Sequence, residues 1–121
     1  MSEKRTKVYS PSEIESRLKR DLPRWSYGDG LIRRRIKTAD WRATLMAINT
    51  IGHLAEAAWH HPEILASYSW LEVRLNTHDS GGVTDKDFEL AKKIDEVVGW
   101  RPGKEGGALE GTPADALYVD L

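Results

Sequence analysis

Three of the four histidines in this sequence lie in two short segments whose residue types suit proton transfer. The segments are His60-His61-Pro62 and Thr77-His78-Asp79, and each comes where an expected helix or strand gives way to a loop. Histidine donates or accepts a proton near neutral pH because its ordinary pKa is about 6.5. The sequence has no cysteine, so thiolate nucleophiles and cysteine-based metal sites are excluded. The two segments therefore predict acid–base chemistry by histidine.

A metal site is a competing interpretation of the first segment. His53, Glu56 and His60 are spaced i, i+3 and i+7, which places a carboxylate and two imidazoles on one helical face. Such spacing is common on amphipathic helices, and no complete ligand signature such as HExxH is present. Metal-free acid–base catalysis is therefore the preferred interpretation.

Motifs for two other reaction classes are absent. The sequence contains no GxSxG motif around a serine nucleophile. It also contains neither GxGxxG nor GxxxxGK[ST], which bind phosphate groups. Ser80-Gly81-Gly82 is interpreted instead as a sharp turn between a strand and a helix.

The length and charge of the chain limit its fold and its partners. Its 121 residues suffice for one domain, and 18 Lys and Arg against 19 Asp and Glu give a net charge of -1. This balance provides no bulk attraction to nucleic acid or anionic lipid. No apolar run approaches the ~20 residues that span a bilayer. We therefore expect a cytoplasmic protein with no membrane contact and no direct nucleic-acid contact.

The spacing of apolar residues and caps predicts the elements that position the two histidine segments. Ser10-Pro11-Ser12-Glu13 begins a helix over 11–21, and the apolar pattern predicts a longer helix over about 41–58. Strands are expected around 25–27, 31–37 and 68–76, and a third helix is expected to begin near 84. In the second strand, Ile32, Arg34 and Ile36 are expected on one face and the other basic residues on the solvated face.

These elements divide the chain into three parts. Residues 1–9 are expected to be a polar lead, 10–99 the folded domain, and 100–121 a Gly- and Pro-rich extension. Within the extension, residues 116–119 could add a short edge strand. The order of helices and strands predicts the α+β class, with a small antiparallel sheet and helices packed on one face.

The two histidine segments belong to a longer motif. It runs E-x-x-x-H-H-P from Glu56 to Pro62, followed by an aromatic at Tyr68, T-H-D at 77–79, and Asp87 on the next helix. This motif resembles the signature of the pterin-4a-carbinolamine dehydratases, also called 4a-hydroxytetrahydrobiopterin dehydratases, over roughly residues 12–99. The resemblance implies an antiparallel sheet of about four strands backed by three helices on one face, assembled as a homodimer or homotetramer.

The resemblance also implies an activity and a set of site residues. Members of the family are hydro-lyases that dehydrate the pterin-4a-carbinolamine released by aromatic amino acid hydroxylases, with no metal or organic cofactor. It assigns catalysis to His60, His61, His78 and Asp87, with His60 and His78 as the leading proton-transfer pair. Asp87 is expected to orient one imidazole, with His78 the first choice. The substrate-binding residues that it implies are Glu56, Trp59, Asn76, Thr77 and Asp79.

Two positions depart from the family pattern and predict a pocket of different shape. Trp59 stands where relatives often carry a small polar or acidic residue, and Ile64 stands where an aromatic is frequent. The alternative function is a non-catalytic binding or assembly role with a protein partner. Some relatives bind a homeodomain transcription factor, and others assist assembly of a carbon-fixing enzyme. The three histidines together with Asp87 favour catalysis over that alternative.

Overall fold

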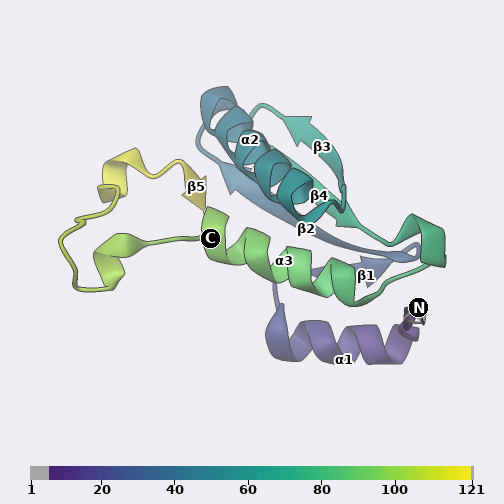
Figure 1. The fold of residues 1–121 in the computed structure, drawn as a ribbon. Coiled ribbons are helices and arrows are strands. Elements are labelled where there is room, and N and C mark those ends of the chain that lie inside the picture. The colour runs from purple at the N-terminus through teal and green to yellow at the C-terminus, as the bar shows by residue number, and fades with distance from the viewer. Residues whose placement is uncertain (1–5, 121) are drawn as a thin grey trace.

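The chain folds as an antiparallel sheet with helices packed against one of its faces (Figure 1). The computed structural model describes residues 6–120, so residues 1–5 of the expected polar lead lie outside the described part. The helices and main strands are α1 (Pro11–Asp21), β1 (Ser26–Gly28), β2 (Leu31–Thr38), α2 (Trp41–Ala58), β3 (Glu63–Ser67), β4 (Trp70–Leu75) and α3 (Asp85–Val98). A last strand, β5 (Val119–Asp120), and short 3-10 turns at His78–Ser80, Pro102–Lys104 and Ala114–Ala116 complete the chain.

The sheet has the strand order β1-β2-β4-β3, and β5 pairs with the end of β2. All of these pairings are antiparallel. The predicted α+β class, with about four main strands and three helices, is confirmed. Among the described residues, no helix is both long enough and apolar enough to cross a membrane.

Capping side chains fix where the helices begin. Ser10 and Glu13 form the predicted capping box of α1, and Asp40 caps α2 by accepting the N–H of Ala43. Thr84 and Asp87 form a second capping box at the start of α3. The helices predicted over 11–21 and about 41–58 are confirmed. They could be predicted because each begins at a cap formed by neighbouring residues.

The edge strand β3 has no counterpart among the expected elements. Its run Ile64-Leu65-Ala66 is apolar at three successive positions, so the alternation typical of a strand is missing. The segment is extended because it pairs with β4 across the tight turn at Tyr68-Ser69. This strand follows His60-His61-Pro62 directly and so fixes the path of the chain after the histidine pair.

The inner face of β2 confirms the predicted alternation. Ile32 and Ile36 are buried, and Arg34 lies between them at 3 % exposure. The Arg34 guanidinium pairs with Asp95 of α3, which also accepts a hydrogen bond from Trp25 Nε1 at 3.0 Å. The buried Arg34 therefore has a half-buried ionic partner, and this pair ties the sheet to α3.

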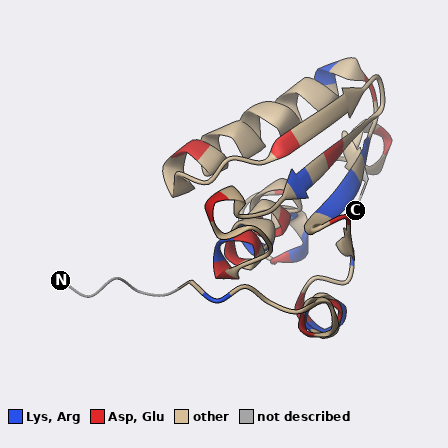
Figure 2. Cartoon of the chain, turned by 90° about the vertical axis from the view of Figure 1, so that its right-hand side faces the viewer, with Lys and Arg blue, Asp and Glu red and all other residues tan. Residues whose placement is uncertain are grey.

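The outer face of the sheet carries charges of both signs, which Figure 2 shows side by side on neighbouring strands. Arg35 and Arg74 both contact Glu72, at 3.5 and 2.7 Å. The hydrogen bond from Arg74 and the nearby guanidinium groups hold the pKa of Glu72 below its usual range. Arg35 is exposed, as expected for a solvated sheet face, while Glu72 between the two guanidinium groups is buried.

Helices α2 and α3 lie side by side and run in opposite directions (Figure 1). The end of α2 therefore meets the start of α3, and this junction holds the first histidine segment. The chain after Val98 leaves from the other end of the helix pair and returns to the sheet as β5 (Figure 1).

Candidate active site

His60 is placed by the way α2 ends. Trp59, the C-cap residue, adopts the left-handed conformation with φ 52° and ψ 46°. The N–H of His60 then donates to the carbonyl of Ala55 at 3.0 Å, which closes the helix. After this turn the His60 side chain lies against α3 and is only 12 % exposed.

Asp87 is the partner of His60. Its carboxylate is fully buried in the first turn of α3, and its Oδ1 lies 2.6 Å from His60 Nε2. Because an ionised carboxylate only accepts hydrogen bonds, we assign the Nε2 proton to His60. The second ring nitrogen, Nδ1, is then the atom that can exchange a proton with a ligand.

The other oxygen of Asp87 is held by two donors. Its Oδ2 accepts the Thr84 N–H at 2.9 Å and the Thr77 hydroxyl at 2.9 Å. The two threonine hydroxyls lie 2.6 Å apart. Since the single hydroxyl proton of Thr77 goes to Asp87, the hydroxyl of Thr84 donates to Thr77 Oγ1. This chain of hydrogen bonds fixes the carboxylate from the side opposite His60.

One of these contacts differs from the sequence-based expectation. Asp87 is expected to orient one imidazole, with His78 the first choice, yet its free oxygen faces His60, because the capping box turns that oxygen toward the end of α2. Thr77 is among the residues expected to bind substrate. Its hydroxyl is buried and bound to Asp87 and Thr84, so in the structure it positions the carboxylate.

His78 lies beside this network, not within it. It begins the 3-10 turn His78–Ser80 and is exposed, while its neighbour Thr77 is bonded to Asp87. Gly81 closes the turn with φ 74°, a conformation that glycine adopts without strain, as the predicted sharp turn requires. Thr77 thus links the His78 segment and His60 to the same carboxylate.

His61 forms a second histidine–carboxylate pair at the surface. Its Nε2 lies 2.7 Å from Glu56 Oε1, and the two side chains are 52 % and 67 % exposed. The rings of His61 and Trp59 meet edge to face with centroids 5.0 Å apart. Glu56 therefore contacts His61, while Asn76 and Asp79, also expected at the site, lie exposed after β4 and in the 3-10 turn.

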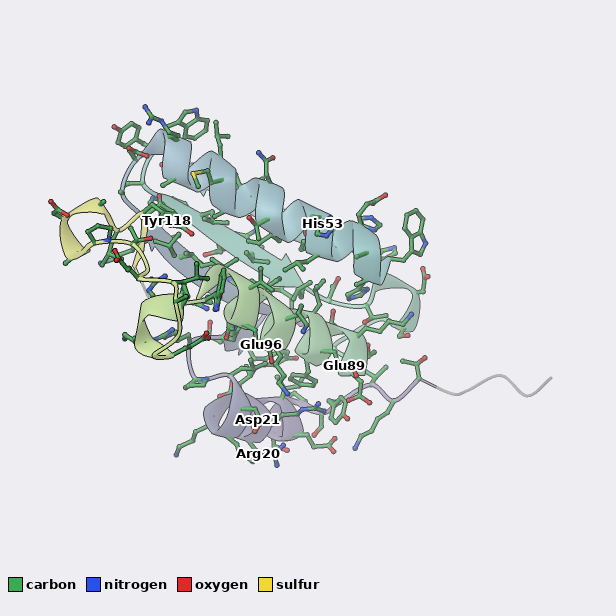
Figure 3. All side chains as sticks on the ribbon, turned by 60° about the vertical axis from the view of Figure 1, so that its left-hand side comes forward. Arg20, Asp21, His53, Glu89, Glu96 and Tyr118 are labelled. Carbon is green, nitrogen blue, oxygen red and sulfur yellow. The ribbon has the colours of Figure 1, made fainter. Side chains whose placement is uncertain are left out.

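The metal site considered from the sequence is not assembled. His53 is exposed on α2 (Figure 3), Glu56 contacts His61, and His60 contacts Asp87. Within residues 6–120, no group of three or more histidine or acidic side chains is arranged to hold a metal ion.

A cavity of about 630 Å³ adjoins His60 between the end of α2 and α3. Its apolar lining is Leu54, Ala57, Ala58 and Leu90, and its other lining residues are Trp59, His60, Lys86, Glu89 and Lys93. Lys86 and Thr84 were not expected at the site. Thr84 is expected from the sequence only as the cap of the third helix, and its T-x-x-D spacing to Asp87 could have linked it to the carboxylate. Lys86 could not have been found, since only packing shows which face of α3 meets α2.

Comparisons with known proteins show which family the chain resembles. The model of the family "Pterin 4 alpha carbinolamine dehydratase" matches residues 7–97. A protein of Aquifex aeolicus, provisionally named pterin-4-alpha-carbinolamine dehydratase, is 40% identical over 89 residues, which cover 74% of this chain and 89% of the relative. A protein of Chloroflexus aurantiacus with the same provisional name is 41% identical over 90 residues, covering 74% of this chain and 96% of the relative.

Two solved structures are also similar. A transcriptional coactivator/pterin dehydratase from Brucella melitensis superposes with a TM-score of 0.70 at 30% identity, covering 76% of this chain and 99% of that one. A pterin dehydratase-like protein described as a RuBisCO assembly factor in the alpha-carboxysome gives a TM-score of 0.51 at 17% identity, covering 63% of this chain and 88% of that one. At that identity the second likeness concerns the fold alone.

Proposed function

The chain belongs to the pterin 4 alpha carbinolamine dehydratase family, and from this premise we propose that it dehydrates a 4a-hydroxytetrahydropterin by histidine acid–base catalysis. The observation that carries the proposal is the His60–Asp87 pair at the rim of a cavity. The buried Asp87 carboxylate is held by two donors on one oxygen and orients the His60 imidazole through the other. A protein that served only as a scaffold would have no need of this arrangement.

The reaction is an elimination across the C4a–N5 bond. The C4a–O bond breaks as an acid protonates the departing hydroxyl, and the N5–H bond breaks as a base takes that proton. The electrons of the N5–H bond then form the C4a=N5 double bond, so quinonoid dihydropterin and water are the products. We assign His60, through Nδ1, and His78 as the proton-transfer pair. His61 binds the ring or serves as an acid on its other face.

The proposal includes a physiological setting. The pterin is that of the aromatic amino acid hydroxylases, whose used cofactor this reaction recycles, and the protein acts in the cytoplasm as a homodimer or homotetramer. Support for self-association comes from α2, where Trp41, Leu45 and Met46 are 46%, 42% and 48% exposed. Apolar side chains grouped on one helix are typical of an interface. Light scattering on the purified chain tests this part separately.

The activity is tested on carbinolamine generated in situ by a hydroxylase and followed by its ultraviolet change. The wild type is expected to accelerate dehydration, and His60→Ala and His78→Ala are each expected to lower kcat by about 10²–10⁴-fold. His53→Ala is the matched control, because His53 is exposed on α2 and outside the His60–Asp87 network. A wild-type rate no faster than buffer would sink the proposal. Fully active His60 and His78 variants would sink the assignment of roles.

The non-catalytic alternative predicts a different result. Under it, pull-down from native lysate recovers a stoichiometric protein partner while the purified chain leaves the carbinolamine untouched. The dehydratase proposal instead requires turnover by the chain alone.

A further inference from the structure

We infer that Trp59 is a stacking platform for the flat heteroaromatic ring of the substrate, and that its strained backbone is retained for this role. The inference rests on the proposed function, since a pterin ring is the ligand considered. It is carried by the backbone conformation of Trp59, the exposure of its side chain, and its contact with the His61 ring beside the cavity that His60 also lines.

The backbone at Trp59 is unfavourable for tryptophan. Its φ of 52° lies in the left-handed region, where a side chain crowds the following carbonyl. Glycine or asparagine normally occupies this position at a helix end. Among the non-glycine residues that the structure describes, only Asp29 shares a positive φ, at 54°. Asp29 lies in the turn between β1 and β2, where aspartate is common.

The side chain of Trp59 gains little from packing within the chain. It is 75% exposed, the highest value among the large hydrophobic side chains of the described residues. Trp25, in contrast, is 4% exposed and packs in the core. An indole left in water forfeits the stabilisation that burial of so large an apolar surface provides. Neither conformational preference nor packing therefore accounts for tryptophan at position 59.

The surroundings of the Trp59 indole indicate a role in ligand binding. Trp59 lines the cavity beside His60, and its ring meets the His61 ring edge to face at 5.0 Å and 81°. The contact with His61 restricts the indole orientation, and the side chain nevertheless stays 75% exposed. Aromatic rings stack in an offset arrangement with centroids ~4.5–7 Å apart, so a flat ligand ring on the indole lies beside both histidines.

The test compares Trp59→Gly and Trp59→Phe with Asp29→Gly, which relieves the other left-handed residue away from the site. For each variant we would measure thermal unfolding, kcat and KM for the carbinolamine, and the Kd of 7,8-dihydrobiopterin by calorimetry. Trp59→Gly is expected to raise Tm while raising KM and Kd by about tenfold, the usual size of a lost aromatic stack. Trp59→Phe retains a stacking face, so its Kd stays within about threefold of the wild type. Asp29→Gly leaves KM and Kd unchanged, because Asp29 lies in the turn between β1 and β2.

The outcomes separate this inference from the proposed function. If the wild type turns over carbinolamine and Trp59→Gly leaves KM and Kd unchanged, the stacking role is overturned and the dehydratase stands. If the wild type binds dihydrobiopterin without turnover, the dehydratase proposal fails, and a tenfold rise in Kd for Trp59→Gly still supports stacking. A wild type that neither binds dihydrobiopterin nor turns over carbinolamine overturns both. A lower Tm for Trp59→Gly contradicts the strain argument.

Discussion

The contacts of Asp87 determine which nitrogen of the His60 ring carries the proton. Asp87 Oδ1 accepts from His60 Nε2, while Asp87 Oδ2 is occupied by Thr84 N–H and the Thr77 hydroxyl. Because both oxygens have assigned donors, the carboxylate has one favourable orientation. The ring therefore presents Nδ1, and a change at Asp87 changes which nitrogen carries the proton.

Asp87→Asn is expected to lower kcat by about 10²–10⁴-fold with little loss of folded protein. Two donors point at the Oδ2 position, so the amide oxygen takes that place and the amide NH₂ faces His60. An NH₂ group donates, which forces the imidazole proton from Nε2 to Nδ1. Steady-state kinetics and ¹⁵N shifts of the His60 ring check the two effects. A kcat within threefold of the wild type would show that the tautomer does not matter.

The identities of the expected catalytic residues could be proposed from the sequence, but their pairing could not. His60 and Asp87 are 27 positions apart, and their contact depends on the antiparallel packing of α2 and α3. His78, the partner expected from the resemblance, is nearer to Asp87 in sequence but lies exposed in the 3-10 turn. Thr77 likewise carries a side chain suited to substrate binding, and only its burial shows that the hydroxyl is already engaged.

The start of α3 serves both the helix and the candidate site. Asp87 completes the Thr84 capping box through one oxygen and contacts His60 through the other. The first helix has the same kind of capping box, made by Ser10 and Glu13, at an exposed position. The chain thus contains two similar caps, of which one contacts a candidate catalytic residue.

Thr84→Ala is expected to lower stability and activity together, whereas Ser10→Ala lowers stability alone. Loss of a capping hydroxyl costs about 0.5–2 kcal/mol of unfolding free energy in either helix. Only Thr84→Ala also removes the donor to Thr77, so kcat should fall about tenfold. Thr84→Ser keeps the hydroxyl and is expected to restore kcat. Denaturant unfolding and kinetics check the pair, and equal kcat values for the two alanine variants would contradict the shared role.

Helices α1 and α3 are tied by a pH-sensitive contact at Asp85. Its Oδ1 accepts from the Tyr9 hydroxyl at 2.6 Å and from Arg17 at 2.8 Å. The Tyr9 hydrogen bond, followed by that from Arg17, lowers the pKa of Asp85 below its ordinary 3.8, with Lys7 adding a weaker attraction. A lowered folded-state pKa stabilises the fold above the unfolded value, and this stabilisation is lost as pH falls.

Asp85→Asn should therefore lower Tm at pH 7, and the difference from the wild type should shrink as the pH falls below about 4, the ordinary pKa of the carboxyl. As the wild-type carboxyl becomes protonated, its advantage disappears. Thermal unfolding over a pH series measures the difference. A difference that stays constant below pH 4 would show that the charge of Asp85 does not stabilise the α1–α3 contact.

Element boundaries followed local signals closely wherever such signals existed. The caps at Ser10 and Asp40 mark α1 and α2 in the sequence itself. The strand β3 lacks alternation, and its conformation comes from pairing with β4. A short strand of this kind is set by its neighbour and not by its own residues, so inspection of single segments misses it.

At the scale of the whole molecule, the part after residue 97 lies outside the family match. It forms a loop that returns as β5, where Val119 is 1% exposed and its carbonyl accepts from Arg101 at 2.7 Å. Figure 3 places Tyr118 of this segment near the start of α2, away from the helix end that carries His60. Within one chain, the segment therefore contributes to the core and not to the candidate site.

Deletion of residues 100–121 is expected to lower the free energy of unfolding by about 2–3 kcal/mol, because the burial of roughly one valine-sized side chain is lost. We expect kcat/KM to stay within about twofold of the value for the full chain. The reason is that β5 completes the core at the end of the helix pair remote from His60. Denaturant unfolding and kinetics of the shortened chain measure both quantities. A folded but inactive product would instead place the segment at a site, as in an oligomer where it reaches a neighbouring copy.

The most direct test of the whole arrangement is a crystal structure of the chain with 7,8-dihydrobiopterin bound. We predict that the ring lies between His60, His61 and His78, with one of its polar atoms about 3 Å from His60 Nδ1. The His60 Nε2 contact with Asp87 should be unchanged in that complex. A pterin bound elsewhere on the protein, or bound with Nδ1 turned away from it, would contradict the assignment of the site.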